Sequence, residues 1–413
     1  MGAPEETVIM NVALKRILVV DDEPQILDLL STVFRGHGWE VTGAGSAAEG
    51  IEKLERGQFD VILTDLIMPG ESGIDLLRAS KEIHPDVEVI LMTGFATADT
   101  AIEAMRTGAF HYLAKPLKLE EVLNLVDKAY LQRHLARENR FLRSEVRAEH
   151  QAQMVVGDSA ATARVVASLQ GIAATGDPLL LVGERGSGRA FFARFVHFSS
   201  PRASGLFVPI YCAGVPPDKA ASDLFGQPPS PGSRTQTSRP GKIELANHGT
   251  LYVADIGDAC RGLLERLVDY VESRTLPAAA PAGAMLPDIR LIFSATVPLD
   301  ELSNREGIPA GLAKALETAT VRIPPLRERN EDIPLLLHHF LDEANRDRKK
   351  PLRGFTQSAL SILEPYEWPG NIRELCNLVR AIASKKKQGT MIDASDIPPE
   401  IIYRQLRKKE PPL

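Results

Sequence analysis

Carboxylate side chains stand where two apolar runs end near the N-terminus, and together they could bind a cation. Asp65 closes the apolar run at 61–63, while Asp21 and Asp22 follow the run 17–20. Runs without polar alternation are typical of buried strands in a parallel sheet, and the carboxyl ends of such strands form the crevice where open α/β sheets bind ligands. Three carboxylates in one crevice repel one another unless a cation lies among them, and oxygen-only ligation suits Mg²⁺.

Two more apolar runs end in polar side chains that could join the same crevice. The run 87–92 ends at Thr93, which offers a hydroxyl, and the run 110–114 ends at Lys115, which offers an ammonium group. Pro116 follows, so the preceding peptide bond can be cis. An aspartate pair, a single aspartate, a threonine and a Lys–Pro pair, each after an apolar run, form a specific constellation.

This constellation resembles the response-regulator receiver domain of two-component signalling, over roughly residues 14–130. The resemblance implies that Asp65 accepts a phosphoryl group from a sensor histidine kinase. It implies that Thr93 and Lys115 bind phosphoryl oxygens and that Tyr112 is the aromatic side chain that turns inward on activation. The Mg²⁺ ligands that it implies are Asp21, Asp22, Asp65 and the carbonyl of Ile67.

The elements that must position these groups are those of a doubly wound parallel sheet. Residues 16–130 alternate five apolar runs with helical patterns, which predicts a five-stranded α/β receiver sheet with helices on both faces. Residues 1–13 are predicted to be a disordered leader. A helical pattern without Gly or Pro continues to about residue 150, and we assign 131–152 as a helical linker. Its leucines favour either an amphipathic helix lying on a domain or a short dimeric coiled coil, and two or three heptads do not decide between them.

The length of 413 residues predicts more than one domain, and the composition limits the class of protein. Apolar residues make up 44% and charged residues 25%, as in ordinary globular proteins, and a net charge of −6 gives no overall affinity for nucleic acid. The three cysteines are isolated, which fits a reducing cytoplasm better than a disulfide or zinc scaffold. We find no signal peptide and no apolar run near the roughly 20 residues that span a bilayer, so we expect a cytoplasmic protein without a membrane segment.

A second α/β pattern begins near residue 156 with a candidate phosphate-binding loop. The strand 178–182 leads into a glycine-rich loop and then a helix, an arrangement whose backbone N–H groups and helix dipole face an anion. The P-loop pattern requires Lys and then Ser or Thr after its last Gly, whereas this chain has Arg189 and Ala190. Arg is a planar fork and Lys a compact charge, so the exchange is not conservative.

Six ordered motifs resemble the central AAA+ domain of NtrC-type bacterial enhancer-binding proteins. They are GERGSGRAFFARFVH, FVPIYCAG, SDLFGQ, RPGKIELANHGTLYVADIGD, RIPPLRERNEDIPLL and WPGNIREL. The resemblance implies an AAA+ α/β subdomain over 153–330, a helical lid over 331–400, and ATP-driven rings that remodel sigma-54 RNA polymerase.

The chain departs from that family at the groups that hydrolyse ATP. The Walker B Asp–Glu pair is Ala254–Asp255, the sensor Asn is Thr296, and the two trans-acting arginines are replaced by Pro309 and Ala315. Phosphoryl transfer depends on positioning and charge neutralisation, and arginine fingers contribute roughly 10³–10⁵ in rate. We therefore expect most hydrolysis to be lost. The degenerate nucleotide site that we assign comprises Gly183, Gly186, Gly188, Arg189, Asp255 and Arg373.

Further departures concern partners. Residues 226–239 are a Pro/Ser/Gly/Thr-rich segment, predicted to be a mobile linker, where the family carries its sigma-contacting loop. The family usually continues into a helix-turn-helix, whereas 401–413 is expected to be a solvated basic tail, with nucleic-acid contact the minor interpretation. Arg373 is either the family's second sensor of a nucleotide or part of a structural salt bridge.

Two function classes follow from these patterns. The first is a phosphorylation-controlled regulator that binds ATP weakly, if at all, and acts by protein–protein contact as a homodimer or in a hetero-oligomer with a related AAA+ activator. The second is a working sigma-54-dependent activator that binds and hydrolyses ATP. We predict no direct DNA binding, because no recognition helix is found.

Overall fold

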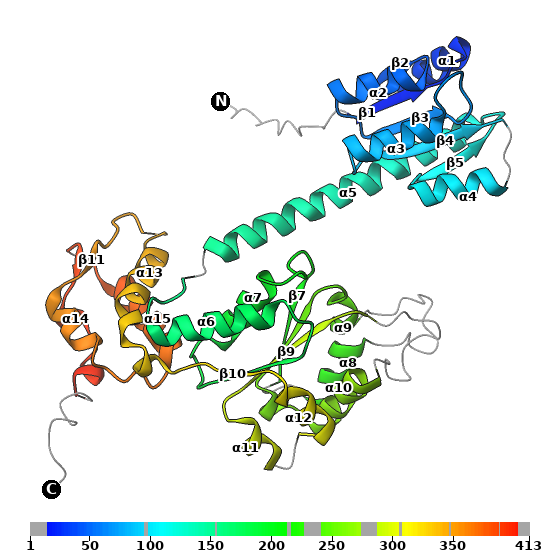
Figure 1. Ribbon diagram of the computed structural model, residues 1–413. Helices are drawn as coiled ribbons and strands as arrows, with labels where there is room; N and C mark the ends of the chain where they lie inside the picture. The colour runs from blue at the N-terminus through cyan, green and yellow to red at the C-terminus, as the bar shows by residue number, and fades with distance from the viewer. Residues whose placement is uncertain are drawn as a thin grey trace, which may run out of the picture. The chain divides into compact units, whose positions relative to one another are not determined.

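The computed structural model describes residues 15–94, 98–152, 155–212, 216–226, 241–273, 287–304, 308–346, 348–387 and 389–403. The chain divides between Val146 and Arg147 into two compact units (Figure 1). The predicted leader, the segment 227–239 and the tail beyond residue 403 lie outside the described residues.

The first unit contains the predicted doubly wound sheet. Its described strands pair in parallel in the order β2-β1-β3-β4-β5. The strands are β1 (Lys15–Val20), β2 (Trp39–Ala44), β3 (Val61–Asp65), β4 (Glu88–Thr93) and β5 (His111–Ala114). The helices are α1 (Pro24–Gly36), α2 (Ala47–Arg56), α3 (Gly73–Ile83), α4 (Ala98–Thr107) and α5 (Leu119–Ala152).

Helices cover both faces of this sheet because every central strand is apolar on both sides. Leu63 and Ile90 belong to a buried cluster that includes residues of α1 and α5, whereas Ile62 and Leu91 belong to a cluster with α2 and α3. Each fully buried side chain of this size contributes about 1.5–3 kcal/mol. The strand ends, and with them the polar crevice, are therefore held by packing from both sides.

Helix α5 continues beyond the sheet and is attached to the first unit by ion pairs. Arg133 pairs with Asp60 just before β3, and Arg140 pairs with Asp86 in the α3–β4 loop at 2.6 Å. These contacts attach α5 to the first unit as far as Arg140. The outer face of the helix carries apolar side chains that are about half exposed, namely Leu131, Leu135, Leu142 and Val146. The assigned division at residue 130 and the coiled coil both stay predictions.

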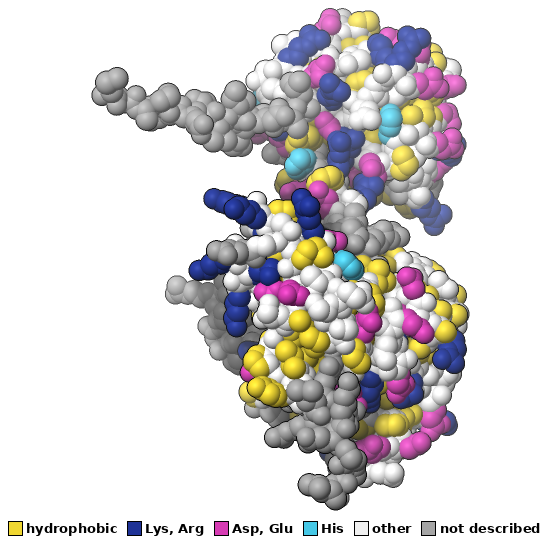
Figure 2. All heavy atoms as spheres, turned by 90° about the vertical axis from the view of Figure 1, so that its left-hand side faces the viewer, with side chains coloured by type: hydrophobic (Ala, Val, Ile, Leu, Met, Phe, Trp, Pro, Cys, Tyr) yellow, Lys and Arg dark blue, Asp and Glu magenta, His cyan; other side chains and the backbone are white. Residues whose placement is uncertain are grey.

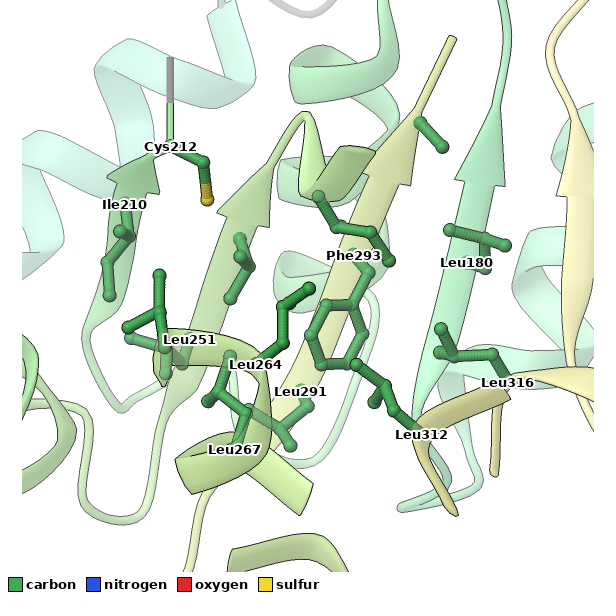
Figure 3. Packing of buried hydrophobic residues seen from close by; sticks show 14 of the residues in the cluster. Leu180, Ile210, Cys212, Leu251, Leu264, Leu267, Leu291, Phe293, Leu312 and Leu316 are labelled. Atoms are coloured by element: carbon green, nitrogen blue, oxygen red, sulfur yellow. The ribbon is translucent and has the colours of Figure 1, made fainter. Parts of the chain in front are cut away.

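The second unit opens with another parallel sheet, in the order β10-β6-β9-β8-β7 among the described strands. The strands are β6 (Leu179–Val182), β7 (Phe207–Tyr211), β8 (Thr250–Ala254), β9 (Arg290–Ala295) and β10 (Thr320–Arg322). The helical segments are α6 (Ala160–Ala173), α7 (Arg189–Phe198), α8 (Pro217–Phe225), α9 (Lys242–Leu245), η1 (Ile256–Asp258), α10 (Arg261–Ser273), α11 (Leu299–Asn304) and α12 (Ala310–Glu317). On one face the ring of Phe293 lies among Leu264, Leu291 and Leu312 (Figure 3).

A helical lid follows the sheet, as predicted. Its elements are η2 (Leu326–Glu328), η3 (Asn330–Asp332), α13 (Ile333–Asn345), β11 (Gly354–Phe355), α14 (Gln357–Leu363), α15 (Asn371–Lys385), β12 (Met391–Ile392) and η4 (Ala394–Asp396). Its core is built around Trp368, which is fully buried and donates its indole N–H to the carbonyl of Leu363 at 3.1 Å. The fold class read from the sequence is therefore confirmed for both units.

The surface of the described residues carries charges of both signs. Figure 2 shows basic and acidic side chains scattered over the face that it displays. Within the described part of the chain, no helix combines the length and the apolar character needed to cross a bilayer.

Candidate functional site

The carboxyl ends of β1 and β3 bring the three predicted carboxylates together. Asp21 is fully buried, Asp65 is nearly so and Asp22 is exposed. Each offers an oxygen within 4.8 Å of the others. This set of oxygen donors is what Mg²⁺ prefers. The crevice therefore fits a divalent cation.

Lys115 supplies the positive charge of the crevice. Its Nζ donates to Asp65 Oδ2 at 2.5 Å and to Asp21 Oδ2 at 3.0 Å, and the Lys115–Pro116 peptide is cis. Partial burial lowers the pKa of the Lys115 ammonium, but its hydrogen bonds to the two carboxylates and their charges outweigh that effect and raise the pKa above its ordinary value. Lys115 is therefore a permanent cation beside Asp65.

The turn after β3 holds the Asp65 carboxylate in place. The backbone N–H of Ile67 donates to Asp65 Oδ1 at 3.3 Å. At Gly73, the first residue of α3, a Cβ would lie 2.1 Å from the carbonyl oxygen of Asp65, so only glycine allows the helix to begin there. Thr93 is buried at the end of β4, the neighbour of β3. Tyr112 lies on β5 with 37% of its surface exposed, so here it does not point into the core.

The glycine-rich loop of the second unit forms the predicted cradle. Gly188 directly precedes α7 as its N-cap with φ of +104°, and Gly186 has φ of +80°, a region that glycine adopts without strain. A cavity of about 540 Å³ lies between this loop, the η2–η3 segment and the lid. Apolar side chains such as Val156, Phe340 and Ile372 line it together with several arginines. Gly183 precedes the loop, and a Cβ there would lie 2.9 Å from the carbonyl oxygen of Ile323 and from the Ser187 hydroxyl.

The two unusual residues of the predicted nucleotide site are paired with each other. Arg189 is only 7% exposed, and its Nη1 lies 2.6 Å from Asp255 Oδ1. Asp255 has a left-handed backbone, with φ of +55°, and its N–H donates to the Ser294 hydroxyl at 3.1 Å. Ala254, buried at the end of β8, offers no carboxylate. The arginine in the P-loop and the aspartate after β8 therefore form an ion pair by distance, in which Nη1 and Oδ1 are buried but not aligned as a hydrogen bond.

The lid motif WPGN fastens the loop from the other side. Asn371 Nδ2 donates to Glu184 Oε2 at 3.0 Å and to the carbonyl of Arg185 at 3.2 Å, and its Oδ1 accepts from the N–H of Leu326. The N–H of Ile372 donates to the carbonyl of Gly186 at 3.1 Å. These bonds fix the loop against the lid.

Arg373 is exposed at the rim of the cavity and forms no ion pair with any residue that the structure describes. The structural salt bridge considered for it is thus not found among those residues. Thr296 is exposed after β9, Pro309 precedes α12, and Ala315 is half-buried on that helix, so none of them supplies a guanidinium group.

Two residues at the cavity were missed in the sequence. Arg329 is 4% exposed and donates to the carbonyl of Ser187 in the glycine-rich loop. Asp332 is 1% exposed and accepts from Ser159 and Thr162 at the start of α6. The signal that could have revealed them is the charged run RERNED at 327–332, directly before the apolar start of a helix at 333–337.

Comparison with known proteins gives matches along both units. Residues 17–127 match the response regulator receiver domain, 155–322 the sigma-54 interaction domain and 327–412 the AAA+ ATPase lid domain. The regulatory protein AtoC of Escherichia coli K12 is 33% identical over 390 residues, which cover 94% of this chain and 84% of that protein.

Further similar proteins span most of the chain. The DNA-binding transcriptional regulator NtrC of Rhizobium meliloti is 33% identical, with 96% of this chain and 79% of that protein covered. The crystal structure of NtrX from Brucella abortus in complex with ADP has a TM-score of 0.57 and 25% identity, and the match covers 94% of this chain and 85% of that one.

Proposed function

The chain belongs to the NtrC family of response regulators, with a receiver domain followed by a sigma-54 interaction AAA+ domain. From this premise we propose that it is a phosphorylation-controlled regulator with little or no ATPase activity. The ion pair between Arg189 and Asp255 carries the proposal. It neutralises the two side chains on which metal and phosphate binding in the P-loop would depend.

In the receiver, we assign Asp65 as the acceptor of the phosphoryl group from a sensor histidine kinase. A bond would form between a carboxylate oxygen and phosphorus while the bond from phosphorus to the kinase imidazole breaks. Mg²⁺ held by Asp21, Asp22, Asp65 and the Ile67 carbonyl would offset the charge of the phosphoryl oxygens. Lys115, already 2.5 Å from Asp65, is placed to bind one of those oxygens, and we assign another to Thr93.

In the AAA+ unit, the residues present fit an adenine nucleotide better than they fit a metal–nucleotide complex. The backbone at Gly186 and Gly188 can hold phosphate, and Arg329 and Arg373 add positive charge. Asp255, however, is already paired with Arg189. We therefore infer weak nucleotide binding that depends little on Mg²⁺.

Hydrolysis needs more than binding. A carboxylate must orient the attacking water, and arginines from a neighbouring subunit stabilise the transition state in this family's rings. Ala254 offers no carboxylate. The two positions of the trans-acting arginines are occupied by Pro309 and Ala315, which have no guanidinium group. This supports an output by protein–protein contact, as a homodimer through the outer face of α5 or in a hetero-oligomer with a related activator.

A second candidate function, an active sigma-54-dependent activator, is favoured by family membership itself. NtrC of Rhizobium meliloti is named as a DNA-binding transcriptional regulator, and solved structures of NtrX are described in complex with ADP and with ATP. This function requires that a nucleotide release Arg189 from Asp255 and that other residues replace the missing groups.

ATP turnover by the full chain separates the two candidates. We expect no turnover above background, with or without acetyl phosphate to load Asp65, and calorimetric titration should show ATP affinity that changes little with Mg²⁺. A matched variant, Arg189→Lys with Ala254→Asp, Asp255→Glu, Pro309→Arg and Ala315→Arg, should gain turnover. If the natural chain hydrolyses ATP when phosphorylated, and Asp255→Ala abolishes that turnover, the protein is an active sigma-54-dependent activator instead.

A further inference from the structure

A second cavity lies in the first unit, at the opposite end of the sheet from Asp65. It has a volume of about 520 Å³ and is lined by residues at the amino ends of β1 and β3 and by one face of α5. The proposed phosphorylation chemistry uses none of these residues. The cavity is therefore a separate feature of the receiver unit.

Two arginines line the helical wall of this cavity. Arg133 and Arg137 are four residues apart and share one face of α5, and Arg140, three residues further on, lies outside the lining. Arg16 contributes a further guanidinium group from β1. Burial, and next the nearby Arg137 and Arg140, lower the pKa of the Arg133 guanidinium, which reflects the positive potential at this wall.

The acidic groups around the cavity already have partners. Both oxygens of Asp60 are used, one by the Arg133 guanidinium and the other by the backbone N–H of Arg16 at 2.9 Å. Glu40 accepts from the Arg16 side chain at 2.8 Å. Asp86 is likewise paired, with Arg140. These carboxylates therefore leave little negative charge for the rest of the wall.

Two arginines of the cavity wall, Arg133 and Arg137, retain groups that could bind an anion. The Nε of Arg133 is buried and has no hydrogen-bond partner within the described part of the chain. Arg137 has no ion-pair partner among the described residues, and apart from Asp60 the carboxylate that lines the cavity is Glu138 on the same helix. Arg137 thus lacks a counter-ion among the described residues, and the buried Nε–H of Arg133 lacks an acceptor that a ligand could provide.

The remaining wall is aromatic. Phe141 lines the cavity with 59% of its surface exposed. Tyr130 stacks on His134 with ring centroids 5.8 Å apart and planes 13° from parallel. A flat apolar group could lie against these rings.

We propose that this cavity binds a small organic anion, with its phosphate or carboxylate group on Arg133 and Arg137 and its apolar body against Phe141. The proposal goes beyond phosphorylation and beyond the nucleotide site, since the residues belong to neither. A ligand that bridges Arg16 on β1 and Arg137 on α5 would also fasten the extension of α5 to the receiver.

Phenyl phosphate is a suitable probe, and calorimetric titration of the full chain gives its affinity. We expect saturable binding that Arg137→Gln weakens about tenfold or more, the loss of one charge-assisted hydrogen bond. Phe141→Ala should weaken phenyl phosphate but leave inorganic phosphate unchanged. Arg143→Gln, on the same helix but outside the cavity, should have no effect. Arg137 is exposed, so its variant should fold.

A second readout is the thermal transition of the first unit. At one fixed concentration, phenyl phosphate should raise its midpoint less in Arg137→Gln than in the natural chain, because the stabilisation grows with the ratio of ligand concentration to Kd. No saturable binding, or equal affinity in the natural chain and in Arg137→Gln, would overturn the site. Inorganic phosphate binding as tightly as phenyl phosphate would overturn the aromatic part of the proposal.

Discussion

Removal of the Asp255 charge is the sharpest test of the paired P-loop. The variant Asp255→Asn keeps the shape of the side chain but leaves the guanidinium of Arg189, 7% exposed, without its counter-ion. Breaking a fully buried ion pair costs about 3–5 kcal/mol. The Asp255 side chain is 28% exposed, so we expect a smaller loss, about 2–3 kcal/mol.

For a unit of this size, that loss should lower the midpoint of thermal unfolding by roughly 5–10 °C. Scanning calorimetry of the nucleotide-free full chain measures it, and the transition of the unchanged first unit serves as an internal reference. Asp258→Asn is the matched control, because Asp258 pairs with an exposed arginine, Arg185, at 3.1 Å. Exposed pairs contribute about 0–1 kcal/mol, so the control should shift much less.

A double-mutant cycle then isolates the interaction. Arg189→Met combined with Asp255→Asn removes both charges, and it should be more stable than the sum of the two single losses predicts, by about 2 kcal/mol. Additive losses, or an Asp255→Asn shift no larger than that of the control, would refute the reasoning that these residues form one unit.

Three other predictions follow from the contacts described above. Asp65→Asn should incorporate no label from radioactive acetyl phosphate with Mg²⁺, and residual label would show a second acceptor. Gly186→Ala should destabilise the second unit by about 2 kcal/mol or more, measured by calorimetry, because the backbone is left-handed and a Cβ would lie 2.3 Å from a lid carbonyl oxygen. The control Gly171→Ala should not destabilise it, because a Cβ there would meet nothing within 4 Å. Leu135→Lys should weaken self-association in sedimentation equilibrium, whereas Gln132→Lys, off the apolar stripe, should leave it unchanged, and equal effects would argue against a helical dimer.

The crevice of the receiver could be predicted because its information is local. Each apolar run predicts a strand, and each strand places the residue at its end, so Asp21, Asp65 and Lys115 converge once the strands are parallel. No long-range pairing has to be guessed beyond the strand order. The same reasoning gave the glycine-rich loop before α7.

Pairings between distant charges could not be predicted in this way. Arg189 is the first residue of α7 and Asp255 follows β8, and the sequence shows two separate substitutions where the structure shows one ion pair. The contact of Arg133 with Asp60 likewise joins a helix to a loop 73 residues earlier. A helical pattern cannot tell which acid such an arginine meets, so the attachment of α5 beyond the sheet was not foreseen.

The paired P-loop also has an evolutionary consequence. Any route from this site to one with a lysine and two Walker B acids must change Arg189 and Asp255, and although lysine and glutamate keep the two charges, the first exchange alters the length and shape of one partner of a close, largely buried pair. Such an intermediate would be less stable without yet hydrolysing ATP. We therefore expect a single mutation at either position to be selected against, and residues 189 and 255 to change together or not at all.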